Sequence, residues 1–328
     1  MKILVTGGAG FIGSCFIRHI LNKYPNYKII NLDALTYAGN IENLNDVKDN
    51  PNYTFVHGNI CNKELAKQVI LDRNVDAVVN FAAESHVDRS ITGPEVFIET
   101  NVKGTLNLLQ TAKEAGVHRF LQVSTDEVYG SLGKEGYFYE TTPLAPNSPY
   151  SASKASADML VRAYFETYKM PVLITRCSNN YGPYQYPEKL IPYFISQLLK
   201  DEKVPVYGDG LNVRDWLYVY DHCRAIDTVL HKGKIGEVYN IGGHNEKTNL
   251  EITRIILEAM GKNESSIKYV EDRLGHDKRY AIDNNKISTE LGWEPSLTFE
   301  EGIKLTIDWY LKNQDWINSI ESKKASLI

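Results

Sequence analysis

The chain has 328 residues, of which 43% are hydrophobic and 23% are charged, and its formal net charge is −5. This composition is that of an ordinary globular protein, and the negative charge argues against a general binder of nucleic acid or membrane surfaces. At roughly 150 residues per domain, the length predicts about two lobes.

The cysteines and the N-terminus indicate the compartment. The cysteines are scattered without a C-x-x-C pair, and no two histidines have metal-ligand spacing, so we expect reduced thiols and no metal site. Gly7, Gly8 and Gly10 interrupt the apolar N-terminus too early for a signal peptide. No apolar run approaches the roughly 18 residues that a membrane span needs. We therefore expect a cytoplasmic protein.

Short apolar runs alternate with amphipathic stretches through the first half of the chain. Strands are predicted at residues 3–6, 28–33, 54–57, 77–81 and 120–124. Helices are predicted between them, at residues 11–23, 63–71 and 99–115. Continuous apolar strands separated by helices are typical of a parallel sheet with both faces covered. The sequence therefore predicts an α/β fold with a doubly wound, Rossmann-type sheet.

The middle of the chain adds a helix and a strand. Ser148 is a favourable N-cap and Pro149 a favourable first helical residue, so a helix is expected to run to about Lys169. Pro171 ends it, and residues 172–176 form the next strand.

After about residue 179 the composition changes, because glycine, proline and tyrosine become dense. Further strands are predicted at residues 204–207 and 238–241, and the second of these could return to the main sheet. We expect a Rossmann-type domain at residues 1–180, a smaller mixed α/β lobe at residues 181–318, and a loose tail at residues 319–328.

A glycine-rich segment lies between the first predicted strand and helix. Gly7, Gly10 and Gly13 allow a tight turn and let backbone N–H groups approach a pyrophosphate. Asp33 ends the second strand, about 20 residues later, where a carboxylate binds ribose hydroxyls and repels a 2′-phosphate. The domain is therefore expected to bind NAD rather than NADP. Further cofactor contacts are expected from the loop and from the ends of the third and fourth strands, at Phe11, Ile12, Asn59, Ile60, Ala82 and Ala83.

Tyr150 and Lys154 lie four residues apart on the predicted helix, so their side chains share one face. A free tyrosine has a pKa of about 10, and lowering it to neutrality takes roughly 4 kcal/mol. One ammonium at about 4 Å, in an effective dielectric of about 20, supplies that much, and a positive nicotinamide ring would add to it. We expect Lys154 to hold Tyr150 as a phenolate base and to bind a ribose.

Thr125, Asp126 and Glu127 follow the strand predicted at residues 120–124, at the edge where ligands bind to parallel sheets. The Thr125 hydroxyl can hydrogen-bond a substrate oxygen. Two adjacent carboxylates cannot both ionise cheaply, so the pKa of one is raised. The pair then provides an acid and a base at the same pH, as the elimination of water requires. Spacing alone does not decide which is the acid.

Together these residues resemble those of the extended short-chain dehydrogenase/reductases, and among them the NAD-dependent sugar-nucleotide 4,6-dehydratases. Further similarities cover nearly the whole chain and include residues 82–88, 178–183, 187–192, 213–216 and 273–277. The Thr125-Asp126-Glu127 triplet is the discriminating feature, because epimerases of the same superfamily usually have small or hydroxyl residues at the carboxylate pair.

The resemblance implies a hydro-lyase reaction on dTDP-glucose that gives dTDP-4-keto-6-deoxyglucose. Tyr150 would remove the C4 hydroxyl proton while the C4 hydride passes to a tightly bound NAD. Glu127 would then remove the C5 proton, Asp126 would protonate the departing C6 hydroxyl, and the hydride would return to C6. A homodimer that pairs helices near residues 99–115 and 151–169 is also implied.

The resemblance also implies binding residues. Thr100 and Asn180 would face the cofactor, together with Tyr150 and Lys154. The substrate would contact a larger set, namely Ser85, Thr125, Asn179, Lys189, Leu190, Pro205, Tyr207, Arg214, Asn249, Arg273, His276 and Tyr280. Its arginines suit this task, because a guanidinium can grip phosphate oxygens with two hydrogen bonds.

Two residues depart from the family pattern. Asn59 replaces the usual Asp beside the adenine, although its side-chain oxygen can still accept a hydrogen bond. Leu274 replaces a usual Pro, which loosens the loop that aims Arg273.

Three alternatives stay open. A UDP-sugar 4-epimerase shares most of these features, but Asp126 and Glu127 argue against it. A 4,6-dehydratase acting on another nucleotide-sugar also fits, because the sequence gives no physical basis for thymine over uracil or for deoxyribose over ribose. A non-catalytic dinucleotide sensor would not need Tyr150 and Lys154.

Overall fold

A computed structural model of the chain describes residues 1–325. Its centre is a seven-stranded sheet in the order β10-β6-β5-β4-β1-β2-β3, and all neighbouring strands are parallel. The strands are β1 (Lys2–Thr6), β2 (Lys28–Asp33), β3 (Tyr53–His57), β4 (Ala77–Asn80), β5 (Arg119–Thr125), β6 (Val172–Cys177) and β10 (Val238–Ile241). The predicted doubly wound sheet is confirmed, and residues 238–241 do return to it, beside β6.

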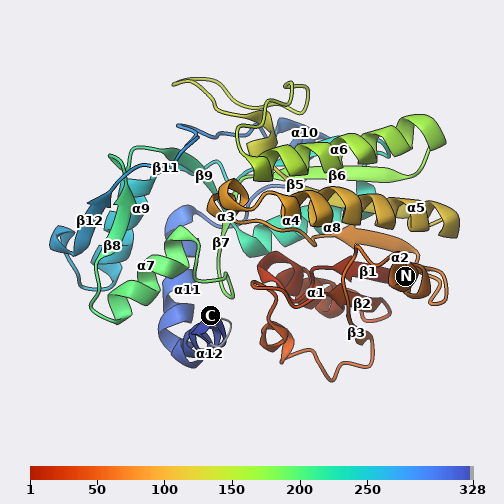
Figure 1. The fold of residues 1–328 in the computed structure, drawn as a ribbon, viewed down its shortest axis with the longest axis horizontal. Coiled ribbons are helices and arrows are strands. Elements are labelled where there is room, and N and C mark those ends of the chain that lie inside the picture. The colour runs from red at the N-terminus through yellow and green to blue at the C-terminus, as the bar shows by residue number, and fades with distance from the viewer. Residues whose placement is uncertain (326–328) are drawn as a thin grey trace.

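Helices cover both faces of this sheet (Figure 1). One face carries α1 (Phe11–Lys23), α8 (Val219–Lys232) and α10 (Asn285–Leu291), and the other carries α2 (Lys63–Ile70), α5 (Thr105–Ala115) and α6 (Pro149–Tyr168). Alternate residues of β1 point to opposite faces, as the period of a strand requires. Ile3 and Val5 pack with α1, whereas Leu4 packs under α5, and all three are fully buried.

The sequence places the ends of α6 correctly. The Ser148 hydroxyl accepts a hydrogen bond from the Ser151 N–H at 3.1 Å, the Ser148 N–H donates to Ser151 Oγ at 3.0 Å, and Pro149 occupies the first turn. Lys169 closes the helix in a left-handed conformation with φ of 53°. The cap fixes where the first turn begins, and that turn carries Tyr150.

The helix predicted at residues 99–115 has a different beginning. After α3 (Val87–Thr92) and α4 (Glu95–Phe97), residues Ile98–Gly104 form a π-helical segment, η2, which continues into α5. The segment lies against α6 and holds the buried Asn101 side chain, which hydrogen-bonds both carbonyl and N–H of Glu84. The π-helical segment therefore carries a tertiary contact. The periodicity of the sequence predicts a helix here but does not show that its turns are wider.

The C-terminal part forms a second lobe beside the sheet, at the left of Figure 1. It holds a three-stranded sheet in the order β11-β9-β7 and a two-stranded sheet of β12 and β8. Its strands are β7 (Asn179–Tyr181), β8 (Val204–Tyr207), β9 (Val213–Tyr218), β11 (Glu246–Thr248) and β12 (Ile267–Val270). Its main helices are α7 (Leu190–Leu199), α9 (Asn249–Ala259), α11 (Phe299–Lys312) and α12 (Gln314–Ala325). Aromatic side chains such as Tyr181, Trp216 and Phe299 fill its core.

The end of the chain differs from the expectation of a loose tail. Residues 319–325 continue α12, and the Ser319 hydroxyl donates to Glu42 Oε2 at 2.9 Å. Trp316 Nε1 donates to Asn43 Oδ1 at 2.9 Å, so the helix docks on the short helix η1 (Ile41–Leu44). Residues 326–328 lie outside the described part of the chain. Within residues 1–325, no helix combines the length and apolarity needed to cross a membrane.

Candidate active site

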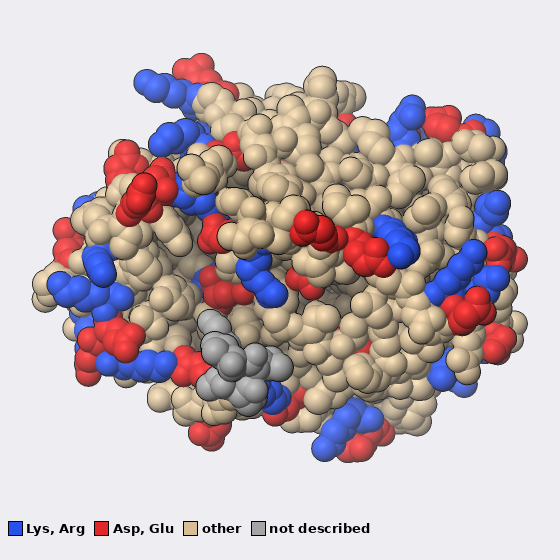
Figure 2. Space-filling view, in the orientation of Figure 1, with Lys and Arg blue, Asp and Glu red and all other residues tan. Residues whose placement is uncertain are grey.

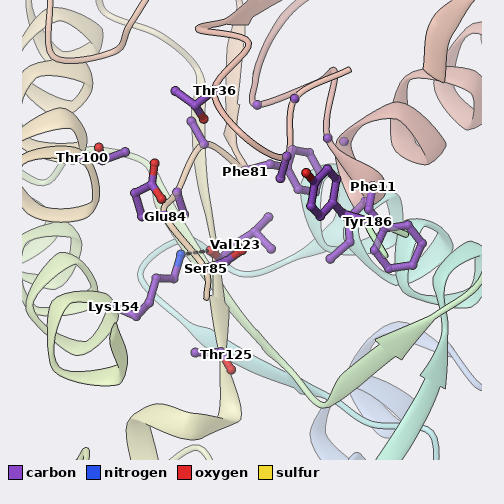
Figure 3. A pocket seen from close by; sticks show the side chains of 18 of the residues that line it. Phe11, Thr36, Phe81, Glu84, Ser85, Thr100, Val123, Thr125, Lys154 and Tyr186 are labelled. Atoms are coloured by element: carbon purple, nitrogen blue, oxygen red, sulfur yellow. Dashed lines mark hydrogen bonds between the residues drawn. The ribbon is translucent and has the colours of Figure 1, made fainter. Parts of the chain in front are cut away.

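Two adjoining cavities lie between the carboxyl ends of the parallel strands and the second lobe. The glycine-rich loop, the ends of β2, β4 and β5, and the start of α6 line the first cavity (Figure 3). The second lobe lines most of the second cavity. Four residues line both, namely Glu127, Asn179, Glu188 and Lys189. Ligands held in the two cavities therefore meet beside Glu127.

The structure brings every residue singled out in the sequence to these cavities. The expected cofactor residues all line the first one, namely Gly7, Gly10, Phe11, Ile12, Gly13, Asp33, Asn59, Ile60, Ala82, Ala83, Thr100, Tyr150, Lys154 and Asn180. Of the expected substrate residues, Ser85 and Thr125 line the first cavity, and Asn179 and Lys189 line both. The remaining ones line the second, namely Leu190, Pro205, Tyr207, Arg214, Asn249, Arg273, His276 and Tyr280.

The glycine-rich loop is tightly packed against its surroundings. Gly7 has φ of +69°, and a Cβ there would lie 2.7 Å from the Ala82 backbone nitrogen. A Cβ at Gly13 would lie 2.3 Å from the Gly7 carbonyl oxygen. Gly10 caps α1 without a side chain, so N–H groups at the start of this helix remain available to an anion. This loop has the form of a pyrophosphate site.

Asp33 is held rigidly at the end of β2. Its Oδ2 accepts from the Ala9 N–H and its Oδ1 from the Leu35 N–H, both at 2.8 Å. Each carboxylate oxygen has a second lone pair, which leaves two acceptors for neighbouring ribose hydroxyls. The Asn59 oxygen, in contrast, already accepts from the Cys61 N–H at 2.8 Å. That oxygen keeps a second lone pair and the amide nitrogen keeps its N–H donors, so Asn59 can still offer either kind of hydrogen bond to an adenine.

The sequence predicts a lowered pKa for Tyr150, and this prediction is wrong for the protein without a bound ligand. Burial, followed by the charge of Glu127, raises the pKa of Tyr150 well above its usual value. The Lys154 Nζ donates to the Val123 carbonyl at 2.8 Å (Figure 3). Burial also lowers the pKa of Lys154. The sequence shows that the two side chains share a helix face, but it does not show that a strand carbonyl competes for the ammonium.

Asp126 and Glu127 have different surroundings, although they are adjacent. Thr125 caps the short helix η3 (Asp126–Tyr129), which turns Asp126 into the protein interior, where it is 1% exposed. Burial, then the negative charges of Glu127 and Asp215, raise the pKa of Asp126 well above its usual value. Its Oδ2 has no hydrogen-bond partner within the described residues. Of the two carboxyl groups, Asp126 therefore has the stronger tendency to hold a proton.

Glu127 lies where the two cavities meet and lines both of them. Burial raises the pKa of Glu127 too, but three cations oppose that shift, namely Lys189, Arg214 and Arg273. All three belong to the C-terminal lobe and line the second cavity. This lobe thus favours the ionised form of Glu127, so the surroundings of the two carboxyl groups push their pKa values apart.

The cations of the second cavity are fixed by protein contacts. Arg214 donates to the Asp277 carbonyl at 2.9 Å and stacks over the Tyr280 ring at 4.3 Å. Arg273 pairs with Asp88 at 3.3 Å, and Lys189 donates to the Ser85 carbonyl at 2.9 Å. This concentration of positive charge is local. On the face drawn in Figure 2, Lys and Arg are interspersed with Asp and Glu.

Sequence analysis missed several side chains at the site. Tyr37 follows the end of β2, where its hydroxyl lies 3.4 Å from Ser85 Oγ and the Arg89 guanidinium stacks on its ring at 4.1 Å. The Tyr186 ring contacts it edge-on at 5.7 Å. Glu84, after β4, also lines the first cavity. The sequence does contain a signal for these residues, because they follow the ends of predicted parallel strands. Loops at these ends are where doubly wound sheets bind ligands.

This sheet, with its glycine-rich loop and its Tyr–Lys pair, defines a class of protein. The class is that of the dinucleotide-dependent enzymes of the short-chain dehydrogenase/reductase type. A protein-family model described as GDP-mannose 4,6 dehydratase matches residues 4–306. The chain belongs to this family.

Named relatives narrow the comparison. A curated dTDP-glucose 4,6-dehydratase from Xanthomonas campestris pv. campestris is 54% identical over 335 residues, which cover 97% of this chain and 95% of that protein. The crystal structure of a dTDP-glucose 4,6-dehydratase from Bacillus anthracis, in complex with NAD, has a TM-score of 0.92 and 58% identity, covering 98% and 99% of the two chains. A Streptomyces venezuelae enzyme of the same name, with NAD bound, has a TM-score of 0.94 and 54% identity, covering 96% and 98%.

Proposed function

We propose that the protein is a hydro-lyase that converts dTDP-glucose to dTDP-4-keto-6-deoxyglucose and water, with a tightly bound NAD. One observation carries this proposal: Tyr150, Asp126 and Glu127 line the same cavity as the glycine-rich loop. That arrangement puts a proton acceptor for an alcohol and an acid–base pair for elimination within reach of one dinucleotide. Relatives with 54% to 58% identical residues, named for this reaction, support the choice of substrate.

The residues present fit NAD. Backbone N–H groups at the start of α1 would hold its pyrophosphate, and a Cβ at Gly7 or Gly13 would fill that cradle. The free lone pairs of Asp33 would take the adenosine ribose, and its charge would exclude a 2′-phosphate. When bound, NAD supplies an acceptor for the C4 hydride of the sugar and later a donor of that hydride to C6.

Tyr150 is the base for the C4 hydroxyl proton. Because burial raises its pKa, the phenolate needs positive charge close to it. Lys154 on the next turn provides one charge, and its ammonium has two further N–H donors for the ribose besides the one bound to the Val123 carbonyl. Thr125, at the end of β5, orients the sugar oxygen by a hydrogen bond from the same cavity.

Elimination is assigned to the carboxylate pair. Removal of the C4 hydride makes C4 a ketone, which acidifies the C5 proton. Glu127, kept ionised by the cations of the second cavity, removes that proton. Asp126, whose pKa burial raises, gives its proton to the departing C6 hydroxyl, which leaves as water. When the hydride is returned to C6, Glu127 gives its proton back to C5, which completes the 4-keto-6-deoxy product. The environment of each carboxyl group therefore supports the roles that the family resemblance implies.

The second cavity is proposed to hold the nucleotide. Arg214 and Arg273 would each grip phosphate oxygens of the diphosphate, and Arg273 would exchange Asp88 for the substrate. Tyr207 and His276 lie edge to face at 6.3 Å and offer an apolar wall for the base. His276 is a buried ring, with its side chain 4% exposed, and Asp272 fixes its Nδ1 at 2.6 Å.

A homodimer and a cytoplasmic location complete the proposal. Large apolar side chains are exposed on the surface of α4, η2 and α6, including Val96 at 45%, Ile98 at 52% and Met159 at 51%. These elements pack against one another, so a second copy would cover them together. Met159→Asp is expected to convert a dimer to a monomer in light scattering. The cysteines are all free thiols, in keeping with a reducing compartment.

Incubation of the protein with dTDP-glucose, UDP-glucose and GDP-mannose tests the substrate directly. We expect a 4-keto-6-deoxy product from dTDP-glucose and a much slower reaction with the other two. A 4-epimer of a UDP-sugar, without loss of water, would identify the epimerase alternative instead. No product with any of the three, despite bound NAD, would favour a dinucleotide sensor.

A further inference from the structure

Glu84 is a carboxyl group in the first cavity to which the mechanism above gives no role. The residue is 5% exposed, and its Oε2 has no hydrogen-bond partner within the described residues. Figure 3 shows the carboxyl among the side chains that line the cavity, between Thr100 and Lys154 in that view. A buried polar atom without a partner costs about 1 to 3 kcal/mol. The atom itself is closed to water, but the carboxyl group lines the cavity, so a rotation of the side chain can present it to a ligand that completes the hydrogen bonding.

The protein fixes the backbone that carries this carboxyl. The Glu84 N–H donates to Asn101 Oδ1 at 2.9 Å, and Asn101 Nδ2 donates back to the Glu84 carbonyl at 3.0 Å. The same Asn101 nitrogen donates to Ser153 Oγ at 2.8 Å, and Ser153 precedes Lys154 on α6. The segment is therefore clamped to the helix that carries Lys154. A backbone held in this way loses little entropy when a ligand binds.

The order of the strands separates Glu84 from Asp33. Glu84 follows β4, whereas Asp33 ends β2, and β1 lies between these two strands in the sheet. Asp33 serves the adenosine ribose in the proposed function, and Lys154 serves the other ribose. Because Asn101 ties Glu84 to the Lys154 helix, the group that completes its hydrogen bonding belongs to the nicotinamide half.

We propose that the Glu84 carboxyl is a further cofactor-binding group, which hydrogen-bonds a hydroxyl of the ribose on the nicotinamide half of NAD. The inference rests on the proposed function, which puts NAD in the first cavity. Burial raises the pKa of Glu84, against the charge of Arg89. A carboxyl group offers acceptor sites to a hydroxyl partner, and its protonated form also offers a donor.

Titration of the full-length protein with NAD and with ADP tests this inference. ADP has only the adenine half and serves as the matched probe. Three variants are compared with wild type: Glu84→Ala, the similarly sized Glu84→Leu, and Glu84→Gln, which keeps a donor and an acceptor. We expect Glu84→Ala and Glu84→Leu to weaken NAD binding about tenfold, which is the effect of losing one hydrogen bond. ADP binding is expected to weaken less than about threefold. The affinity of Glu84→Gln is expected to stay within about threefold of wild type for both ligands.

The outcomes separate this inference from the proposed function. Unchanged NAD affinity in both Glu84→Ala and Glu84→Leu would overturn it. An equal loss for ADP and NAD would also overturn it, since that result means a general distortion of the cavity. A loss in Glu84→Gln as large as in Glu84→Leu would exclude a neutral hydrogen-bonding role. Failure of the wild-type protein to bind NAD would instead refute the proposed function.

Discussion

Replacing both members of the carboxylate pair is expected to separate oxidation of the sugar from elimination of water. In Asp126→Asn with Glu127→Gln, Tyr150 and Lys154 are untouched, so the C4 hydroxyl can still lose its proton and hydride. The amides can neither accept the C5 proton nor protonate the leaving hydroxyl. The reaction is therefore expected to stop at the 4-keto sugar, with reduced cofactor held on the enzyme.

The size of the effect follows from the burial of the pair. Asp126 is 1% exposed, so bulk water cannot replace it as the acid. Positioned acid–base groups contribute about 100- to 10,000-fold to a proton-transfer step. This range corresponds to about 3 to 5 kcal/mol of activation free energy. With both groups removed, elimination is expected to slow by at least the upper end of this range, roughly 10,000-fold.

Rapid mixing with dTDP-glucose, followed by absorbance of the reduced nicotinamide, measures the two phases separately. We expect a normal rise and no subsequent decay in the double variant, and no rise in Tyr150→Phe, which lacks the first base. Normal turnover of the double variant would refute the roles given to the pair. Absence of the rise, with substrate bound, would show that these carboxyl groups act before or during oxidation.

Three further predictions concern the cofactor site and stability. Asp33→Ala is expected to weaken NAD and to relax discrimination against NADP, measured by titration with both; an unchanged preference would contradict the role of Asp33. Gly13→Val is expected to abolish NAD retention while circular dichroism stays native, because its Cβ would displace the Gly7 carbonyl; retained NAD would contradict this. Asp227→Asn is expected to cost about 1 to 3 kcal/mol in urea unfolding at neutral pH, because a buried carboxylate loses its hydrogen bonds to His19 and Lys23. Burial opposes ionisation of Asp227, but hydrogen bonds led by His19 outweigh it and lower its pKa, so the stabilisation is present above pH about 4 and is lost below it. The difference between wild type and Asp227→Asn should shrink as the pH falls below about 4, and a constant difference would contradict the assignment.

The main sheet was predictable because its signals are local. A glycine-rich turn followed by an amphipathic run sets α1, and an apolar run ending in Asp33 sets β2. The smaller strands were not predictable in the same way. β7 and β11 have three residues each, and they become strands only because both pair with β9. Their conformation depends on distant residues, which sequence periodicity does not contain.

The identity of the site residues was easier to predict than their protonation. Tyr150 and Lys154 share a helix face, as their spacing requires, and both reach the cavity. The direction of the pKa shift of Tyr150 depends on burial and on Glu127, which approaches from another element. The same holds for the carboxylate pair, because two cations that lower the pKa of Glu127, Lys189 and Arg273, come from loops of the second lobe. Sequence spacing cannot provide that difference.

The dependence of Glu127 on these cations has a measurable consequence. In the free enzyme, Arg214 and Arg273 lower its pKa against the effect of burial. If the substrate diphosphate binds both arginines, its negative charge offsets their field, and the pKa of Glu127 rises in the complex. A base with a higher pKa needs a higher pH to be ionised, so the acidic limb of kcat should lie at higher pH than that of kcat/KM, which reports the free enzyme. Arg273→Gln removes part of that field and should bring the two limbs together. Coinciding limbs in the wild-type enzyme would mean that the diphosphate does not bind beside Glu127.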